Sequence, residues 1–269
     1  VGSVGMFLLL FGFASFLHGS SSLVMIAGAV VVIVMLFGWF GTVINESLSG
    51  KYNDQVDTSF RMAMGWFIFS EVMFFAAFFG ALFYARMYAI PWLGGGSNNV
   101  MTQELLWPAF EAVWPTNGPG NVGGDFQTMG PWGIPAINTL ILLSSGVTVT
   151  WAHWGLKKGD RTQLILGLMA TVALGFLFIS LQAYEYYHAY HELNLKLTTG
   201  MYGTTFFMLT GFHGLHVTLG AIMLFVVMIR AMKGHFTEEH HFAFEAAAWY
   251  WHFVDVVWLG LFVFVYWLV

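Results

Sequence analysis

The chain has 269 residues, of which 58% are hydrophobic and only 9% are charged, with a formal net charge of −5 and no cysteine. Soluble domains carry about 25% charged residues, so this composition indicates a polytopic membrane protein. The lack of a basic patch excludes a nucleic-acid partner. The lack of cysteine excludes disulfides, thiolate-bound zinc or copper, iron–sulfur clusters and covalent haem attachment through cysteine in this chain.

The apolar stretches predict an all-α fold with seven transmembrane helices, since runs of about 20 apolar residues cross a bilayer as helices. We expect a single membrane domain over 1–269. The chain begins at Val1 without an initiator Met or a charged amino-terminal region, which suggests a truncated start and not a signal peptide. In chain order, the expected spans are 3–19, 23–45, 60–90, 132–156, 163–191, 200–230 and 243–269.

The distribution of basic residues predicts the orientation of these spans. With the amino terminus inside, seven basic residues lie at inner edges and two at outer edges. This asymmetry predicts the amino terminus inside and the carboxyl terminus outside. The long connection 91–131 has no Lys or Arg, as expected of an external loop, and its segment 102–114 has the composition of an interfacial turn. The inner residues are Lys51, Arg61, Lys157, Lys158, Arg161, Arg230 and Lys233, and the outer ones are Arg86 and Lys196.

Glu71 is a carboxyl group deep in the third span. It follows Arg61 by ten residues, which is roughly 15 Å at 1.5 Å per residue. Only Ser70 is a polar neighbour in the sequence, so Glu71 must be protonated or bonded to something outside its own helix. A structural hydrogen bond and a proton-carrying or docking role both remain open.

Four other polar side chains form two buried pairs within the spans. His213 and His216 share one face of the sixth span, and His252 and Asp255 share one face of the seventh, because residues three apart on a helix are neighbours. The simplest expectation is hydrogen bonding to each other or to neighbouring helices. Ligation of haem or copper is the alternative.

Two Glu-x-x-His motifs, Glu185/His188 and Glu238/His241, raise the possibility of a di-iron centre. Counting from Arg161 places Glu185 roughly 36 Å along its helix, near the outer surface. Glu238 and His241 lie in an inner connection instead. The two motifs therefore face opposite sides of the membrane, which argues against metals that must lie ~4 Å apart.

Two groups of polar residues gather at the inner surface. His153, His241 and Glu245 converge at one depth, where they could bind a zinc ion or collect protons, or simply form a solvated polar interface. Arg230, Lys233 and His235 form a basic fringe suited to lipid phosphates.

Several segments, in order along the chain, resemble the cytochrome c oxidase subunit III family. The resemblance covers Val1 to Val269, and the long loop 91–131 is more similar to bacterial than to mitochondrial members. It therefore implies a multi-pass protein of the bacterial cytoplasmic (inner) membrane. The segments are SEVMFFAAFF (70–79), INTLILLSSGVTVTWAH (137–153), GDR (159–161), LQAYEYYHA (181–189), YGTTFFMLTGFHGLHV (202–217) and HHFAFEAAAWYWHFVDVVWL (240–259).

The resemblance implies an accessory subunit that carries no haem and no copper, and no metal is expected in it unless the surface cluster His153, His241 and Glu245 binds one. Haem a and copper lie in the partner subunits; this chain packs directly on subunit I, with subunit II in the same complex and cytochrome c as electron donor. The helices at 1–45 stand apart from those at 60–269, and phospholipids fill the V-shaped cleft between them. Glu71 matches a membrane-embedded carboxyl beside this cleft. Lipid-contacting positions match Trp39, Glu46, Phe67, Arg230 and His235, and Asn45 replaces an arginine found in mitochondrial members.

The expected function is therefore a non-redox subunit of a proton-pumping oxidase that binds phospholipids, stabilises the catalytic subunit, and supports proton uptake and oxygen access. The alternatives are the matching subunit of a quinol oxidase, an independent metal-dependent membrane oxidase, and a proton or solute channel centred on Glu71. Seven spans and WYWHFVDVVWL (249–259) favour the cytochrome c branch.

Overall fold

The computed structural model describes residues 1–269 and confirms an all-helical membrane protein. Six helical stretches are long and apolar enough to cross a membrane, and one further apolar helix, α1 (Gly2–Leu17), has 16 residues. The predicted spans are thus confirmed as helices, six of them at spanning length. The six stretches are Leu23–Leu48, Asp54–Leu93, Ile134–Lys157, Arg161–His191, Gly200–Met232 and Phe242–Trp267.

The third helical stretch begins earlier than the sequence analysis placed it. It comprises α3 (Asp54–Tyr84), the π-helical turn η1 (Ala85–Ala89) and α4 (Ile90–Leu93). The Asn53 side chain accepts a hydrogen bond from the Val56 backbone N–H at 3.0 Å, which caps the first turn. The expected start at residue 60 was wrong because the first turn is polar, and a hydropathy pattern detects only apolar residues.

The chain divides into two compact units, Val1–Phe60 and Arg61–Val269. In the first unit, α1 and α2 (Leu23–Leu48) pack closely through glycine. A Cβ atom on Gly12 would overlap the backbone of Met25, and one on Gly28 would overlap the backbone of Leu9. Small residues at a helix–helix contact allow this approach in membranes, where packing replaces the hydrophobic effect.

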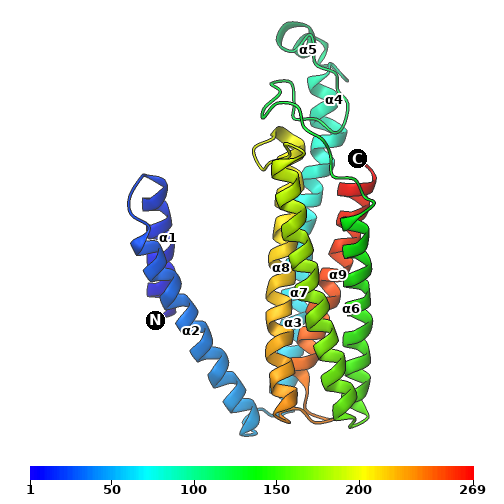
Figure 1. Ribbon diagram of the computed structural model, residues 1–269. Coiled ribbons are helices and arrows are strands. Elements are labelled where there is room, and N and C mark those ends of the chain that lie inside the picture. Colours follow the sequence, from blue (N-terminus) through cyan, green and yellow to red (C-terminus); the bar gives the residue numbers. More distant parts are fainter. The chain divides into compact units, whose positions relative to one another are not determined.

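The second unit is a bundle in which α3, α6 (Ile134–Lys157), α7 (Arg161–His191), α8 (Gly200–Met232) and α9 (Phe242–Leu261) run alongside one another (Figure 1). We call the end that carries the connection 94–133 the loop end and the opposite end the turn end. At the turn end, Asp160 caps α7 by accepting from the Gln163 backbone N–H at 3.0 Å. Beyond α9, the π-helical η2 (Phe262–Trp267) continues to the loop end.

Trp251 and Trp258 form the centre of the bundle, and both are fully buried. The Trp251 ring fills the space left by Gly175 on α7 and Gly220 on α8, where added Cβ atoms would lie 2.8 and 2.9 Å from the ring. Its Nε1–H donates to Ser145 Oγ on α6 at 2.8 Å. One side chain of α9 therefore joins three neighbouring helices.

Helix α3 packs on the bundle mainly through aromatic side chains. Phe67 stacks on Tyr250 with ring centroids 6.1 Å apart, and Phe75 lies 6.0 Å from Phe253. Most other side chains of α3 face away from the bundle, and Phe75 and Leu82 are its buried residues. Helix α3 is therefore attached through a small number of ring contacts, and polar contacts add to them.

The segment 102–114 is helical only in its first part. Helix α5 (Val100–Leu106) ends before Trp107, and the chain then runs without regular structure to Gly133.

Candidate functional site

Glu71 on α3 and His216 on α8 form a hydrogen bond between two helices. His216 Nε2 lies 2.8 Å from Glu71 Oε2. The imidazole ring is surrounded by Phe74, Phe75 and Tyr250, with centroid distances of 5.7, 5.0 and 6.3 Å. Glu71 therefore has a partner outside its own helix, which the sequence analysis expected as one of two alternatives.

The other imidazole nitrogen determines where the proton of this pair lies. His216 Nδ1 is 2.6 Å from the Phe212 carbonyl oxygen, which can only accept, so Nδ1 carries a hydrogen. A neutral His216 then presents a bare Nε2 to Glu71, and the carboxyl must supply the proton of the 2.8 Å bond. If the proton moves to Nε2, the pair becomes imidazolium and carboxylate. The geometry thus permits transfer of one proton within the pair.

His213 and His216 share a face but do not bond each other. His213 Nε2 donates to the Val254 carbonyl on α9 at 3.0 Å, and its Nδ1 is buried without a partner. His213 thus bonds α9 and His216 bonds α3, in agreement with the expected hydrogen bonding to neighbouring helices.

The pair on α9 is buried only in part, so the expectation that both residues are buried was wrong for His252. Asp255 is buried, whereas the His252 side chain is 48% exposed. The two side chains are 3.5 Å apart, and His252 Nε2 lies 3.3 Å from Thr150 Oγ1 on α6. Residues three apart on a helix differ in direction by about 60°, so one can face the core while the other faces outward.

His153 on α6 and His241 and Glu245 at the start of α9 converge at the turn end. One ligand atom from each residue lies within 4.8 Å of the other two. Glu245 Oε1 is 3.2 Å from His241 Nε2 and 3.7 Å from His153 Nε2. Both Nε2 atoms are buried without a hydrogen-bond partner. We call these three residues the turn-end cluster.

Two further contacts orient the turn-end cluster. His241 Nδ1 donates to the Thr237 carbonyl at 3.0 Å, so in the neutral ring Nε2 is the acceptor nitrogen. Arg61 Nη1 donates to the other carboxylate oxygen of Glu245, Oε2, and the guanidinium lies over the Phe242 ring. Arg61 was expected only as a basic residue at the inner edge, and its pair with Glu245 was not predicted from the sequence.

The basic fringe forms where α8 ends. The Arg230 guanidinium lies 4.7 Å from the Phe236 ring centroid, and Arg230 Nε and His235 Nδ1 are buried without partners. Desolvation, and then the charges of Arg230 and Lys233, lower the pKa of His235 below its usual value of 6.5. His235 is therefore neutral near pH 7 and can donate to a phosphate without adding charge.

The remaining expected lipid positions lie on exposed helix surfaces. Trp39 in the first unit is 59% exposed, and Phe67 in the second is 45% exposed. Glu46 Oε2 accepts a hydrogen bond from the Tyr52 hydroxyl at 2.9 Å. Partial burial and then the neighbouring Glu46 carboxylate raise the pKa of Tyr52 above 10.

The two Glu-x-x-His motifs lie at opposite ends of the bundle. Glu185 is fully buried at the loop end, where its Oε1 accepts from the Tyr266 hydroxyl at 2.6 Å. Glu238 and His241 lie at the turn end, and His241 belongs to the turn-end cluster. The two motifs are therefore separated, as predicted, but the burial of Glu185 by the surrounding protein was not predicted.

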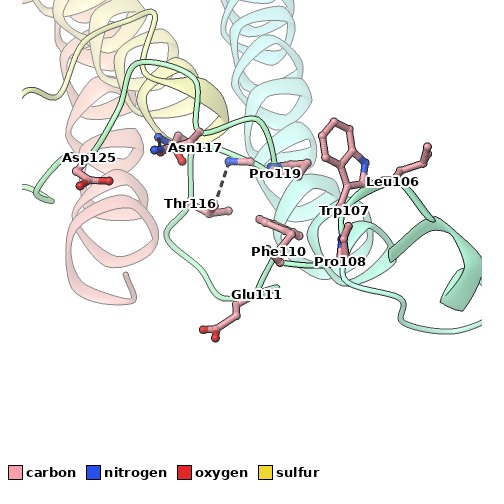
Figure 2. Close-up of a pocket in the computed structure, with 12 residues that line it drawn as sticks. Leu106, Trp107, Pro108, Phe110, Glu111, Thr116, Asn117, Pro119 and Asp125 are labelled. Atoms are coloured by element: carbon pink, nitrogen blue, oxygen red, sulfur yellow. Dashed lines mark hydrogen bonds between the residues drawn. The ribbon is translucent and has the colours of Figure 1, made fainter. Parts of the chain in front are cut away.

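The connection at the loop end contains an open hollow of about 430 Å³. Figure 2 shows Trp107 and Phe110 on one side and Asn117 and Asp125 on the other, with Glu111 at the edge. Thr116 Oγ1 accepts from the Gly118 N–H at 3.0 Å, so part of its polar lining is engaged in holding the loop. This hollow does not bring an acid, a base and a nucleophile together.

The comparisons with known proteins agree on one family. A sequence profile described as cytochrome c oxidase subunit III matches residues 1–269. Curated relatives named cytochrome c oxidase subunit 3 are 42% identical in Gadus morhua, 41% in Carassius auratus and 40% in Dugong dugon. Each alignment spans 267 residues, which is 99% of this chain and 92% of the relative.

Proposed function

Because the chain belongs to the cytochrome c oxidase subunit III family, we propose that it is the non-redox accessory subunit of a proton-pumping, oxygen-reducing oxidase. The single observation that carries this proposal is the family match over the whole chain. In the proposed complex, haem a and copper lie in partner subunits, this chain contacts subunit I directly, and cytochrome c donates electrons. The membrane is the bacterial cytoplasmic membrane, with the amino terminus inside.

Phospholipid binding is the chemical role that the chain's surface supports best. Trp39 and Glu46 offer an aromatic surface and a polar end in the first unit. In the second unit, Phe67 offers an exposed ring, and Arg230, Lys233 and His235 offer donors for a phosphate. The V-shaped lipid cleft stays a prediction from the family resemblance. We propose that these lipids stabilise the catalytic subunit and contribute to oxygen access.

Proton uptake is the second role that we propose. The turn-end cluster gathers two imidazoles and a carboxylate where the chain meets the inner surface in the proposed orientation. Imidazole is the side chain whose unperturbed charge change lies within the physiological pH range, so two adjacent imidazoles at this surface are suited to collecting protons for the catalytic subunit.

The first prediction tests the accessory role by dissociating this chain from the purified oxidase. We expect the optical spectrum of haem a and the bound copper to stay with the remaining subunits. Turnover should begin near normal but be lost progressively, because the stabilising contacts and lipids are gone. Metal analysis of the separated chain, with the intact complex as control, checks the result. Iron or copper remaining stoichiometrically with the separated chain would contradict the accessory role and favour a metal-dependent oxidase.

A specific observation also favours an alternative use of the turn-end cluster: we propose that the same nitrogen atoms bind zinc, which takes the place of their protons when it is bound. Bond lengths of 2.0–2.2 Å and tetrahedral geometry place zinc ligand atoms ~3.3 Å apart. The two separations from Glu245 Oε1, 3.2 and 3.7 Å, are close to this value, and all three ligand atoms lie within 4.8 Å of one another. The Thr237 carbonyl would fix His241 in the ligating tautomer, as metal-bound histidines require. Three protein ligands would leave the fourth position to water.

The second prediction follows from this geometry. Zinc titrated into the intact oxidase should bind at the cluster, and His241→Gln or His153→Gln should weaken that binding by more than ~100-fold, because each removes a ligand. His240→Gln is the matched control, since His240 is adjacent, exposed and outside the cluster. Zinc per complex after gel filtration, with X-ray absorption to identify the ligands, measures the effect. Equal retention of zinc by the His241 and His240 variants would contradict the site.

A further inference from the structure

The loop end of the bundle contains buried polar atoms that no protein group satisfies. Asn138 on α6 is fully buried, and neither Nδ2 nor Oδ1 has a partner. Gln182 on α7 lies near the Tyr266 hydroxyl, but neither of its buried amide atoms has a partner at hydrogen-bonding distance. Oε2 of Glu185 is also buried without a partner. More than about 90% of buried polar atoms in proteins are paired, so these five atoms require an explanation.

The packing of α6 against α7 brings these side chains to one level. Gly155 packs on Leu164, and the hydroxyl oxygens of Thr148 and Thr171 are 2.8 Å apart. In these pairs the two residue numbers sum to 319, as antiparallel helices in a constant register require. The same register continued to the loop end places Asn138 opposite Leu181, so Asn138 and Gln182 lie at nearly the same level along the bundle. Glu185 lies on the same face of α7, one turn beyond Gln182.

Tyr266 on η2 encloses this layer from a third direction. Its hydroxyl donates to Glu185 Oε1 at 2.6 Å, and Tyr266 is buried. Next to it, Trp258 lies 4.8 Å from Phe178 and 5.9 Å from Tyr266 between ring centroids. The polar layer is therefore bounded by aromatic rings on the side toward the bundle centre, and the unpaired atoms cannot reach bulk solvent in that direction.

The types of atom in the layer decide what can satisfy them. The two amide nitrogens are donors and the two amide oxygens are acceptors, while the free Glu185 oxygen needs a donor if ionised and an acceptor if protonated. A hard cation would satisfy only the oxygens. An apolar group would satisfy none of the five. Water both donates and accepts, and a buried water usually makes about three hydrogen bonds.

We infer that Asn138, Gln182 and Glu185 bind a cluster of internal water molecules that joins α6, α7 and η2 at the loop end. The waters bridge the two amides and complete the hydrogen bonding of the Glu185 carboxyl, whose other oxygen is held by Tyr266. The bundle thereby gains a hydrogen-bonded connection beside the buried rings of Trp258 and Tyr266.

The third prediction tests the cluster with apolar substitutions in the intact oxidase. If waters bridge the layer, Asn138→Leu or Gln182→Met leaves them short of partners, and the midpoint of thermal dissociation of this chain should fall by about 2–4 °C. In the double variant, the midpoint of thermal dissociation should fall by less than the sum of the two single decreases, because both side chains bind the same waters. Ser180→Ala on the exposed side of α7 is the control and should leave the midpoint unchanged.

If the layer contains no water, the opposite result is expected. An unpaired buried amide then costs free energy, so replacing it with an apolar side chain would leave the stability unchanged or increase it. A high-resolution map of the oxidase gives an independent readout. Ordered waters within hydrogen-bonding distance of all three side chains support the inference. A direct amide–amide contact, or density with the short distances of a metal ion, contradicts it.

Discussion

Replacing Trp251 by alanine is expected to be the most destabilising single substitution in the bundle. The ring is fully buried and fills the space at Gly175 and Gly220, so its removal leaves a large cavity among three helices. Loss of a buried Trp typically costs about 3–5 kcal/mol. We expect the variant to be lost from the oxidase during purification or to dissociate at a much lower temperature. Recovery of the chain in the purified complex measures this fourth prediction.

Two matched variants on α9 separate packing from hydrogen bonding. Trp251→Phe keeps a ring but loses the N–H that donates to Ser145, so we expect a cost of about 0.5–1.5 kcal/mol. Trp249→Ala removes the same type of side chain from a position that is 38% exposed, and it should have a much smaller effect. If Trp251→Ala and Trp249→Ala behaved alike, the glycine-lined position of Trp251 would not determine stability.

The helical architecture could be predicted because lipid allows the backbone few alternatives. Each long apolar run had to be a helix, and the structure contains helices at all of the predicted positions. The errors lie at the ends, where other forces act. The early start of α3 at Asp54 depends on the Asn53 cap and on acidic residues in its first turn, which an apolar count cannot detect.

The candidate sites were predicted where depth alone is informative and missed where the partner lies on another helix. His153, His241 and Glu245 all sit near the same end of their helices, so counting residues sufficed to bring them together. The Glu71–His216 bond required knowing that α3 faces α8 at that level, and periodicity cannot give this. The Arg61–Glu245 pair was missed for the same reason.

Burial was the least predictable property of the polar residues. His252 and Asp255 have the same depth and helix, yet they differ in exposure because the packing of α9 against α6 buries only one of them. Glu185 was placed near the surface by its height along α7, but η2 covers it. The sequence around a polar residue does not indicate which carbonyl or hydroxyl group of a neighbouring helix it contacts.

The fifth prediction concerns Glu71, where a structural role and a proton-carrying role give different results. Glu71→Leu leaves His216 Nε2 buried without a partner and removes the main polar contact between α3 and α8. We expect a loss of about 1–3 kcal/mol and a reduced amount of this chain in the oxidase. Glu71→Gln keeps a donor, since the amide N–H can bond the bare Nε2, so assembly should stay near normal. Ser70→Ala is the control for the contact within α3, because the Ser70 hydroxyl donates to the Phe67 carbonyl at 2.6 Å and reaches Glu71 Oε1 only at 3.4 Å.

Turnover then separates the two roles in the variant that assembles. An amide cannot release a proton, so Glu71→Gln should lower proton uptake or shorten sustained turnover if the Glu71–His216 pair transfers protons. Unchanged pumping per electron over many turnovers would assign Glu71 a structural role only. A double variant, Glu71→Leu with His216→Leu, adds an independent check on that structural role. Replacing both partners by apolar side chains leaves no buried atom unpaired, so the double variant should assemble better than Glu71→Leu alone. If it assembled no better, the defect of Glu71→Leu would have to come from the changed shape of the side chain and not from the broken hydrogen bond.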